Sequence, residues 1–316
     1  MRRALARDFA SVPGVEVVAT LDGRLDPGPT QSGVNYRIIT DREPLDFARM
    51  AGAADATLAV APESGGALAS LARAIERSGG RSLGSSPSAI ERTADKLRLA
   101  RHFEGLGIPT PPTRPVGPGH PWPVDWPGPV VVKPIDGAGA VDTSLVADGT
   151  CPPWVVEGRR AIAQPYLDGE PMSASFLVDR SGRATLFAVG RQRVVVDGSG
   201  RITYEGGSIS CRVDFSLAAV SGAVASVPGL LGFVGVDFLK LGDRSVAILE
   251  VNPRATTSVV ALARLLPPGT LAGAWLAASA GPLAGTEWPA RLRAAAEAAP
   301  VTFDADGSIQ PGVIHR

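Results

Sequence analysis

The sequence predicts an α/β (α+β) protein with more than one subdomain, and three observations carry this prediction. The chain has 316 residues, which exceeds the usual size of a single hydrophobic core. Strand-like and helix-like segments alternate through residues 1–86, as in a small parallel α/β domain. After residue 160, short strands joined by turns replace this alternation, which indicates an antiparallel sheet.

Residues 1–86 are expected to form the parallel α/β domain. Apolar residues follow helical spacing in three stretches and strand-like spacing in four others. The expected helices are 2–12, 44–50 and 67–77, and the expected strands are 15–21, 36–40, 57–60 and 82–84. The segment opens on a helix, whereas such domains usually open on a strand, so the first strand of the usual pattern is missing.

Residues 87–163 are expected to form a second unit, joined to the first by two helices. Ser88 and Glu91 have the spacing of a capping box, so one helix is expected to begin at Ser88. Another helix is expected over 93–106. The stretch 108–129 that follows is rich in Pro and Gly and is expected to be extended or loop.

A strand over 129–134 is expected to carry Lys133 near its end, just before a loop of small residues. Gly137 and Gly139 lie in this loop, and small residues let backbone N–H groups approach phosphate oxygens closely. A Gly-x-Gly loop alone is usually only a turn. The lysine upstream makes phosphate binding an equal alternative to a simple turn.

Residues 164–316 are expected to form an antiparallel sheet followed by packing helices. A linker containing Pro165 follows an apolar strand, and two sheets are expected to meet there. Turns rich in Asp, Gly and Ser then join successive strands. The expected strands are 172–178, 186–189, 194–196, 235–239 and 246–251, the expected helices are 216–230, 259–266 and 271–280, and 204–208 is expected to be a loop.

Glu250 and Asn252 are candidate metal ligands at the end of the last of these strands. Residues two apart on a strand point to the same face, so both should project together, with Leu249 facing the other way. Asp237 lies on the preceding strand of the same hairpin. Carboxylate and amide oxygens suit a hard cation such as Mg²⁺. A solvated strand end is the alternative, and the apolar neighbours of Asp237 argue against it.

The composition argues against several classes of partner and site. The net charge is zero without a long charged block, so nucleic acid and acidic membrane surfaces are not expected as partners. Cys151 and Cys211 are too few for a disulfide framework, fit a reducing cytoplasm, and have no identifiable base partner for catalysis. The three histidines lack metal-ligand spacing. Neither a signal peptide nor a membrane-spanning run is recognisable, so a cytoplasmic protein is expected.

Lysine is rare in this chain. Lys96, Lys133 and Lys240 are the three lysines among 31 Lys and Arg residues. A site that needs a compact ammonium rather than a guanidinium fork would explain a retained lysine, and chance survival on the surface is the alternative.

Five motifs, taken in chain order, resemble those of the ATP-grasp superfamily of carboxylate–amine ligases. They are Ala94-Asp95-Lys96, Val131-Val132-Lys133-Pro134, Gln164-Pro165-Tyr166-Leu167-Asp168-Gly169-Glu170, Gly235-Val236-Asp237-Phe238 and Glu250-Val251-Asn252-Pro253-Arg254. Their order, spacing and strand placement agree over nearly the whole chain. The resemblance implies an ATP-grasp fold with an N-terminal domain (1–86), a central lid subdomain with linker helices (87–163) and a C-terminal antiparallel-sheet subdomain (164–316). ATP is expected between the last two.

The resemblance also implies a role for each matching residue. The implied roles are phosphate binding by Lys96, Lys133 and the loop with Gly137 and Gly139; adenine binding by Gln164, Pro165, Tyr166 and Leu167; ribose binding by Glu170; metal binding by Asp237, Glu250 and Asn252; and catalysis by Arg254 and Lys133. The implied cofactors are ATP and Mg²⁺, expected as two ions, with Mn²⁺ as an alternative metal.

Within the superfamily, the sequence looks most like the ligases that join glutamate to tyramine in methanofuran biosynthesis, a part of one-carbon metabolism. Ala61-Pro62-Glu63, Tyr204-Glu205-Gly206-Gly207 and the residues from Gly235 to Ser258 carry this narrower resemblance. It implies an ADP-producing ligase that joins the glutamate side chain to a tyramine- or tyrosine-like amine through an acyl phosphate. The alternatives are another ATP-grasp activity (a different amino-acid ligase, a bicarbonate-activating carboxylase or a small-molecule kinase) and a non-catalytic nucleotide-binding module.

The substrate residues are less well defined by the sequence. Glu63, Glu205 and Ser208 are candidates near the amine or amino-acid substrate, with exposed loop surface as the alternative. Arg191 and Arg193 share one face of a strand and could bind a carboxylate, and solvated arginines are the equal alternative. Small-molecule substrates are therefore the expected partners. A homodimer is expected from family analogy alone.

Overall fold

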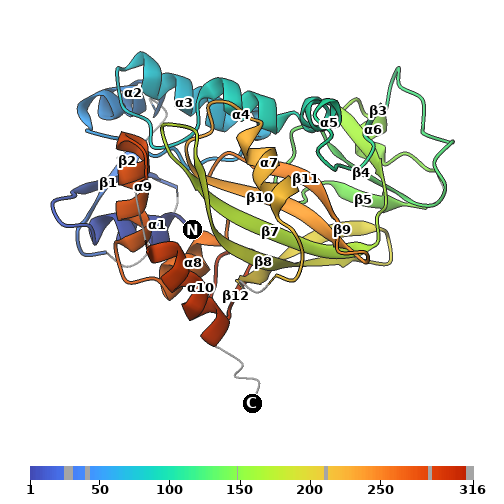
Figure 1. Cartoon of the computed structure of the whole chain (residues 1–316). Coiled ribbons are helices and arrows are strands. Elements are labelled where there is room, and N and C mark those ends of the chain that lie inside the picture. Colours follow the sequence, from blue (N-terminus) through green and yellow to red (C-terminus); the bar gives the residue numbers. More distant parts are fainter. Residues whose placement is uncertain (25–30, 40–42, 148, 210–212, 284–286, 311–316) are drawn as a thin grey trace.

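Helices and one large sheet make up the molecule. Figure 1 shows the computed structural model, which describes residues 1–24, 31–39, 43–147, 149–209, 213–283 and 287–310. Its mixed helix and strand content, with an antiparallel sheet, confirms the predicted α/β (α+β) class.

The N-terminal elements alternate much as predicted. They are α1 (Arg2–Ala10), β1 (Val17–Asp22), β2 (Val34–Ile39), α2 (Glu43–Ala53) and α3 (Ala67–Arg77), and β1 pairs with β2 in parallel. The strands predicted at 57–60 and 82–84 are wrong as full strands, since they meet only in one parallel bridge, Thr57 to Ser82. Beyond Pro62 the chain turns into a short 3₁₀ helix, Ser64–Gly66, so the bridge cannot extend.

Two consecutive helices, α4 (Pro87–Ala94) and α5 (Lys96–Gly105), begin at other residues than predicted. The cap of α4 is Ser86, whose hydroxyl accepts the Ala89 N–H at 3.3 Å, and not Ser88. The second helix begins at Lys96 because Asp95 is extended and its carboxylate accepts the Arg98 N–H at 2.9 Å. Lys96 therefore occupies the first turn of α5.

The sheet contains ten described strands, in the order β11-β10-β7-β8-β9-β5-β4-β6-β3, with β12 also paired to β9. The strands are β3 (Arg114–Val116), β4 (Val130–Pro134), β5 (Thr143–Val146), β6 (Ala161–Pro165), β7 (Gly169–Val178), β8 (Ala184–Val196), β9 (Arg201–Ile209), β10 (Gly232–Leu241), β11 (Val246–Asn252) and β12 (Val301–Asp304). The pairing of β5 with β9 joins the strands around β4 to those around β7. The two expected sheets therefore form one continuous ladder.

Residues 204–208, predicted as a loop, belong instead to β9. Gly206 and Gly207 allow β12 and β8 to approach on either side: a Cβ at Gly206 would lie 2.1 Å from the Phe303 carbonyl oxygen, and one at Gly207 would lie 2.4 Å from that of Arg191. The glycines therefore serve close strand pairing rather than a turn. The strands predicted at 186–189 and 194–196 are likewise one strand, β8.

The two faces of the sheet pack against different helices. On one face, Phe176, Val178 and Val234 pack with α7 (Ala218–Ala225), α4 and α5. On the other, Leu177 and Phe233 pack with α1, α8 (Val259–Leu265), α9 (Thr270–Ala280) and α10 (Trp288–Ala298). Figure 1 shows α8, α9 and α10 in red beside α1. Neighbouring residues on β7 and β10 thus serve opposite faces, as strand alternation requires.

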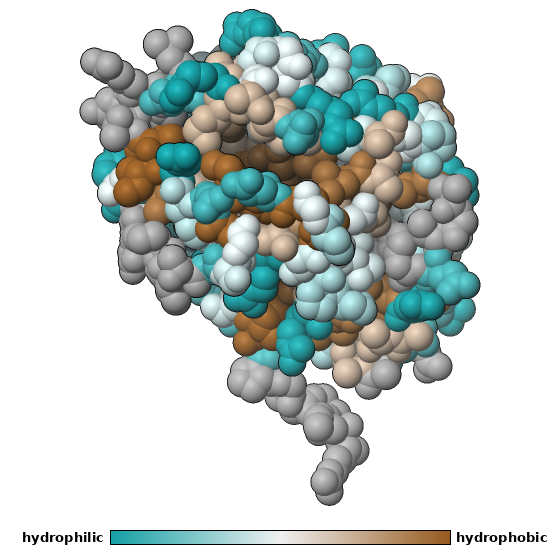
Figure 2. Space-filling view, turned by 90° about the vertical axis from the view of Figure 1, so that its left-hand side faces the viewer, coloured by the Kyte–Doolittle hydropathy of each residue, from teal (hydrophilic) through white to brown (hydrophobic). Residues whose placement is uncertain are grey.

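Hydrophobic residues also reach the surface in places. Figure 2 shows the side of the molecule that faces left in Figure 1, where hydrophobic residues gather along a recess with hydrophilic residues around it.

Among the described residues, no single helix is long and apolar enough to cross a membrane. The pair α8 and α9 passes the length and composition test only when taken together, across a bend of 114°.

A buried aspartate ties the first helix to α9. Asp8 on α1 accepts the backbone N–H groups of Gly269 and Ala272, each at 2.7 Å. Burial raises the pKa of Asp8, and these two hydrogen bonds partly oppose that shift. The first turn of α9 has no partner for these N–H groups within its own helix, so Asp8 satisfies donors that would otherwise be lost.

Replacing Asp8 should therefore destabilise the whole chain. We expect Asp8→Ala to lower the free energy of unfolding by about 1–3 kcal/mol, because two buried N–H groups lose their acceptor. Urea unfolding followed by circular dichroism measures this. The exposed Asp55→Ala variant is the control. Equal unfolding midpoints for the two variants would contradict the proposed role of Asp8.

Candidate functional site

A cavity of about 480 Å³ lies between the loop after β4 and the sheet. Its lining includes twelve of the residues predicted for the site: Lys96, Lys133, Gly137, Gly139, Gln164, Pro165, Tyr166, Leu167, Asp237, Glu250, Asn252 and Arg254. These residues come from α5, β4, β6, β10 and β11 and from the segments that follow the strands. The fold therefore brings together side chains that are up to 158 positions apart (Lys96 to Arg254).

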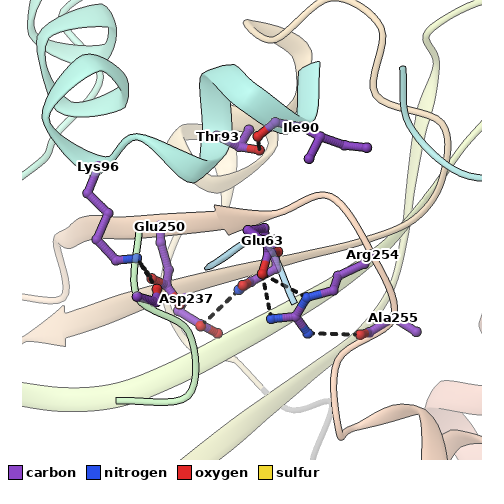
Figure 3. A network of polar contacts seen from close by, with 10 residues as sticks. Glu63, Ile90, Thr93, Lys96, Asp237, Glu250, Arg254 and Ala255 are labelled. Atoms are coloured by element: carbon purple, nitrogen blue, oxygen red, sulfur yellow. Dashed lines mark hydrogen bonds and ion pairs between the residues drawn. The ribbon is translucent and has the colours of Figure 1, made fainter. Parts of the chain in front are cut away.

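Two carboxylates face each other across neighbouring strands at one end of this cavity. Asp237 on β10 is the register partner of Glu250 on β11. Asn252 donates its side-chain N–H to Asp237 Oδ2 at 3.0 Å, and Gln192 on β8 donates to Oδ1 at 2.8 Å. Lys96 Nζ lies 3.2 Å from Glu250 Oε2, as Figure 3 shows.

Burial and mutual repulsion shape the electrostatics of this pair. Burial and the adjacent Glu250 charge raise the pKa of Asp237 well above its ordinary value. Burial also favours a higher pKa for Glu250, but the charges of Lys96 and Lys133 outweigh it and lower that pKa to about 2. Two acidic groups held this close in a partly dry site favour a cation between them.

The donor set fits a hard divalent cation. Asp237 and Glu250 supply carboxylate oxygens, and Asn252 supplies an amide oxygen while its N–H group binds Asp237. Oxygen donors of this kind suit Mg²⁺ or Mn²⁺. Among the residues that the structure describes, no group of three or more His, Cys, Asp or Glu side chains could hold a metal. A set of metal ligands at this site must therefore include the amide oxygen of Asn252.

Leu249 departs from the alternation predicted for its strand. Asp237 pairs with Glu250, and the next residue, Phe238, pairs with Ile248, so a bulge leaves Leu249 without a register partner. Leu249 consequently lines the same cavity as Glu250 instead of facing away from it.

Both predicted lysines reach the cavity from opposite sides of the Gly137 loop. Lys96 is buried, and its ammonium donates to the carbonyl oxygen of Gly137. Lys133 stands near the end of β4, where burial lowers its pKa to about 8 against the opposing effect of Glu250. The third lysine, Lys240, instead pairs with Glu170 and Asp214.

The residues after β6 form a largely apolar end of the cavity. Gln164 is buried and its side chain donates to Thr113 at 2.8 Å, so its side chain is committed to the protein. Pro165, Tyr166 and Leu167 follow it along the lining. Apolar residues from other segments also line the cavity: Pro111, Val131, Leu239 and Leu249. Val131 lies beside Gln164 in the pairing of β4 with β6. A flat heterocycle would suit such an apolar lining.

Six other predicted residues do not line this cavity: Glu63, Glu170, Arg191, Arg193, Glu205 and Ser208. Glu170 lies 2.5 Å from Arg191 Nε and 3.5 Å from Lys240 Nζ. Arg193 pairs with Asp304 at 2.6 Å, and the Glu205 side chain is exposed. Ser208 pairs with Arg191 in the β8–β9 ladder, and Glu63 contacts Arg254 from behind the lining, so neither residue lines the cavity itself.

Several lining residues were not predicted. Gln192, Val194 and Val196 occupy alternate positions of β8, and Gln192 lies between Arg191 and Arg193, which do not line the cavity. The alternation that grouped Arg191 with Arg193 also predicts this opposite set. Tyr204 and the segment Thr256–Ser258 also line the cavity; they belong to the stretches that carry the narrower resemblance but had no predicted role. Phe303 lines it too, and no sequence signal marked this residue.

Arg254 is held by a buried carboxylate from the N-terminal part of the chain. Its Nε and Nη2 atoms both lie 2.9 Å from Glu63 Oε2, and Nη1 donates to the Ala255 carbonyl at 3.2 Å (Figure 3). Glu63 is 6% exposed, and its other oxygen, Oε1, is buried without a hydrogen-bond partner among the described residues. Nearby, the Gly65 N–H donates to Asp136 Oδ2 at 3.0 Å. The N-terminal domain therefore touches both Arg254 and the loop over the cavity.

Cys151 is not among the residues that line this cavity. Cys151 is a free, partly buried thiol packed against the small core of β4 and β6, and burial raises its pKa. Cys211 and His315 lie outside the described residues. The ring of His102 contacts the Ser226 carbonyl at 2.9 Å, on the far side of α5 from the cavity lining.

The chain is similar to known proteins along much of its length. The pre ATP-grasp 3 domain family matches residues 15–90, and the ATP-grasp domain family matches residues 93–258. The second match covers more than half of the chain. The chain belongs to the ATP-grasp family.

Two curated relatives are tyramine–L-glutamate ligases. The relative from Methanocaldococcus fervens is 26% identical over 211 residues, which cover 66% of this chain and 61% of that protein. The relative from Methanocaldococcus jannaschii is 28% identical over 211 residues, which cover 66% and 58%. The matched region thus spans about three fifths of the length of each relative.

The fold recurs in solved structures. An L-amino acid ligase from Bacillus licheniformis superposes with a TM-score of 0.60 at 17% identity, over 80% of this chain and 64% of that one. This likeness confirms the ATP-grasp fold.

The Glu63–Arg254 pair generates a test of stability. We expect Arg254→Met to lower the free energy of unfolding by about 3 kcal/mol, because it leaves the Glu63 carboxylate buried without its partner. The double variant Glu63→Gln with Arg254→Met should recover part of that loss. Urea unfolding of both variants and of the wild type measures it. Additive losses in the double variant would show that the two residues do not depend on each other.

Proposed function

We propose that the chain is an ATP-dependent ligase that joins a carboxylate to an amine and releases ADP and phosphate. The observation that carries the proposal is the half-buried Asp237–Glu250 pair with Lys96 and Lys133 around one cavity. Membership of the ATP-grasp family supports it. In this proposal, Lys96, Lys133 and the Gly137–Gly139 loop bind the phosphates of ATP, and the segment from Gln164 to Leu167 binds the adenine.

Asp237, Glu250 and Asn252 would hold the divalent metal ions of this site. Bound there, Mg²⁺ or Mn²⁺ would neutralise phosphate charge. The role of Gln192 is to fix the Asp237 carboxylate, since its amide already donates to Oδ1. Lys96 does the same for Glu250. These contacts hold both carboxylates in place before any ligand binds.

The first chemical step brings two anions together. A substrate carboxylate oxygen attacks the γ-phosphorus of ATP, a P–O bond forms, and the bond to the β-phosphate breaks as ADP leaves. Two unit charges 4 Å apart repel by about 4 kcal/mol at an effective dielectric constant near 20. Lys133 and Arg254 offset this repulsion from the cavity wall.

The second step forms the amide. The neutral amine attacks the acyl carbon of the acyl phosphate, the C–O bond to phosphate breaks, and the nitrogen loses a proton to solvent. Water competes for the same intermediate. The loop from Gly137 to Ala140 would exclude it, and contacts from Lys96 to Gly137 and from Gly65 to Asp136 hold that loop down.

For the substrates, we propose the side chain of glutamate and a tyramine- or tyrosine-like amine. The two curated relatives named as tyramine–L-glutamate ligases support this choice. The proposal places the reaction in methanofuran-type cofactor biosynthesis in the cytoplasm. Glu170 on β7 remains the proposed ribose contact, which would require its carboxylate to exchange Arg191 or Lys240 for the ribose hydroxyls.

The activity can be tested by trapping the acyl phosphate with hydroxylamine. We expect hydroxamate from glutamate, ATP and Mg²⁺ without an amine, and amine-dependent ADP and phosphate release when tyramine or tyrosine is added. ATP binding without phosphate release for any acid and amine pair would contradict a ligase. Transfer of phosphate to a hydroxyl, or bicarbonate-dependent ADP release, would identify the other ATP-grasp activities instead.

Two substitutions test the assigned residues. Lys133→Ala and Glu250→Ala should each lower the rate of hydroxamate formation by about 100-fold or more. The first removes a positive charge beside the reacting phosphate, and the second removes a ligand of the proposed metal ion. The exposed Glu76→Ala on α3 is the control and should match the wild type. Near wild-type activity of Glu250→Ala with Mg²⁺ would show that the metal assignment is wrong.

A further inference from the structure

The cavity continues along the sheet beyond the carboxylate pair. In the strand register, Asp237 lies beside Ser173, and Ser173 lies beside Gly190. Two residues further along β8, Gln192 lies beside Gly207 of β9. Paired residues share a face, so Ser173 and Gly190 follow Asp237 on one face of the sheet, and Gln192 lies on the same face as Gly190. Of these, Ser173 and Gln192 line the cavity, so it extends from Asp237 onto β7 and β8.

Beyond β8, the aromatic ring of Phe303 lines the cavity. Phe303 on β12 pairs with Gly207 and lines the cavity. The tip of its ring lies 3.4 Å from the position that a Cβ at Gly207 would occupy. A side chain at residue 207 would thus fill the space in front of the ring.

Uncharged residues surround Phe303 at this end. Tyr204 and Ile202 of β9 and Val194 of β8 line the cavity there. The cations of the lining, Lys96, Lys133 and Arg254, come from α5, β4 and the end of β11 instead. The cations of the cavity and this group of uncharged residues therefore lie on different elements.

We propose that Phe303, Tyr204 and Val194 form an aryl subsite that binds the ring of the amine substrate. This inference rests on the proposed ligase function and adds which residues select the amine. A glutamate-like acid carries two carboxylates and belongs at the cationic end, whereas an arylalkylamine carries one nitrogen and an uncharged ring. Bound with its ring at Phe303, such an amine directs its nitrogen past Gln192 toward Asp237.

The dimensions agree with this arrangement. Asp237 and Phe303 lie on strands four positions apart in the sheet, because β10, β7, β8, β9 and β12 are neighbours in that order. At the usual strand spacing this separates their backbones by about 19 Å. After side chains are allowed for, that length takes an acyl phosphate followed by an arylalkylamine.

The subsite includes a residue outside the matched ATP-grasp region. That region ends at residue 258, whereas Phe303 lies on β12, which docks beside Gly206 and Gly207. Its contribution to amine choice is thus a property of this chain's C-terminal strand.

Two variants change the subsite in opposite senses. Phe303→Leu removes the ring while keeping an apolar side chain in the core, and Val194→Phe fills the space in front of it. We expect both to raise the KM for tyramine by about tenfold or more, as loss of one buried ring implies. Hydroxamate formation with hydroxylamine, which has no ring, should stay within about twofold of the wild type in both.

A misfolded variant is recognised by its hydroxylamine reaction, which would fall together with tyramine coupling. Phe303→Leu should also narrow the difference in KM between tyramine and ethylamine, because only tyramine loses a ring contact. An unchanged tyramine-to-ethylamine ratio in both variants would overturn the aryl subsite while leaving the ligase function in place. Absence of hydroxamate with the wild type would instead overturn the proposed function, and the subsite with it.

Discussion

The site depends on two carboxylates that the fold holds face to face. The register of β10 and β11 places Asp237 opposite Glu250, and two carboxylates removed from water in this way need hydrogen bonds or an opposite charge. The surrounding polar residues supply these contacts: Asn252 and Gln192 donate to Asp237, and Lys96 pairs with Glu250. The positions of α5, β8 and the end of β11 are thereby tied to one pair of charges.

Much of this arrangement could be predicted from local pattern. Alternation along β11 placed Glu250 and Asn252 together, and the short turn after β10 placed Asp237 beside them. Pattern failed where the outcome depends on a partner strand. The bulge at Leu249 exists only relative to β10, and the strand-like run at 57–60 found a single bridge. Gly206 and Gly207 looked like a loop because the strands that crowd them lie far away in sequence.

Contacts between side chains that are far apart in the sequence also could not be predicted from it. Glu63 and Arg254 are separated by 191 positions, and only the folded chain shows that they meet. The same holds for Phe303, which reached the cavity through a strand that carried no motif. By contrast, the starts of α4 and α5 were misplaced by only two or three residues: Ser88 was predicted as the cap in place of Ser86, and residue 93 as the second helix start in place of Lys96.

The ladder between β5 and β9 has a mechanical consequence. Thr143 and Ser144 pair with Ile202 and Arg201, and the Leu145 N–H donates to the Gly200 carbonyl at 2.7 Å. The strands β4 and β5, which flank the glycine loop, are therefore hydrogen-bonded through β5 to β9 and the rest of the sheet. Swinging these strands away as a free flap would break the hydrogen bonds between β5 and β9. Flexing of the Gly137 loop, or a bend shared across the whole sheet, would widen the cavity and keep them.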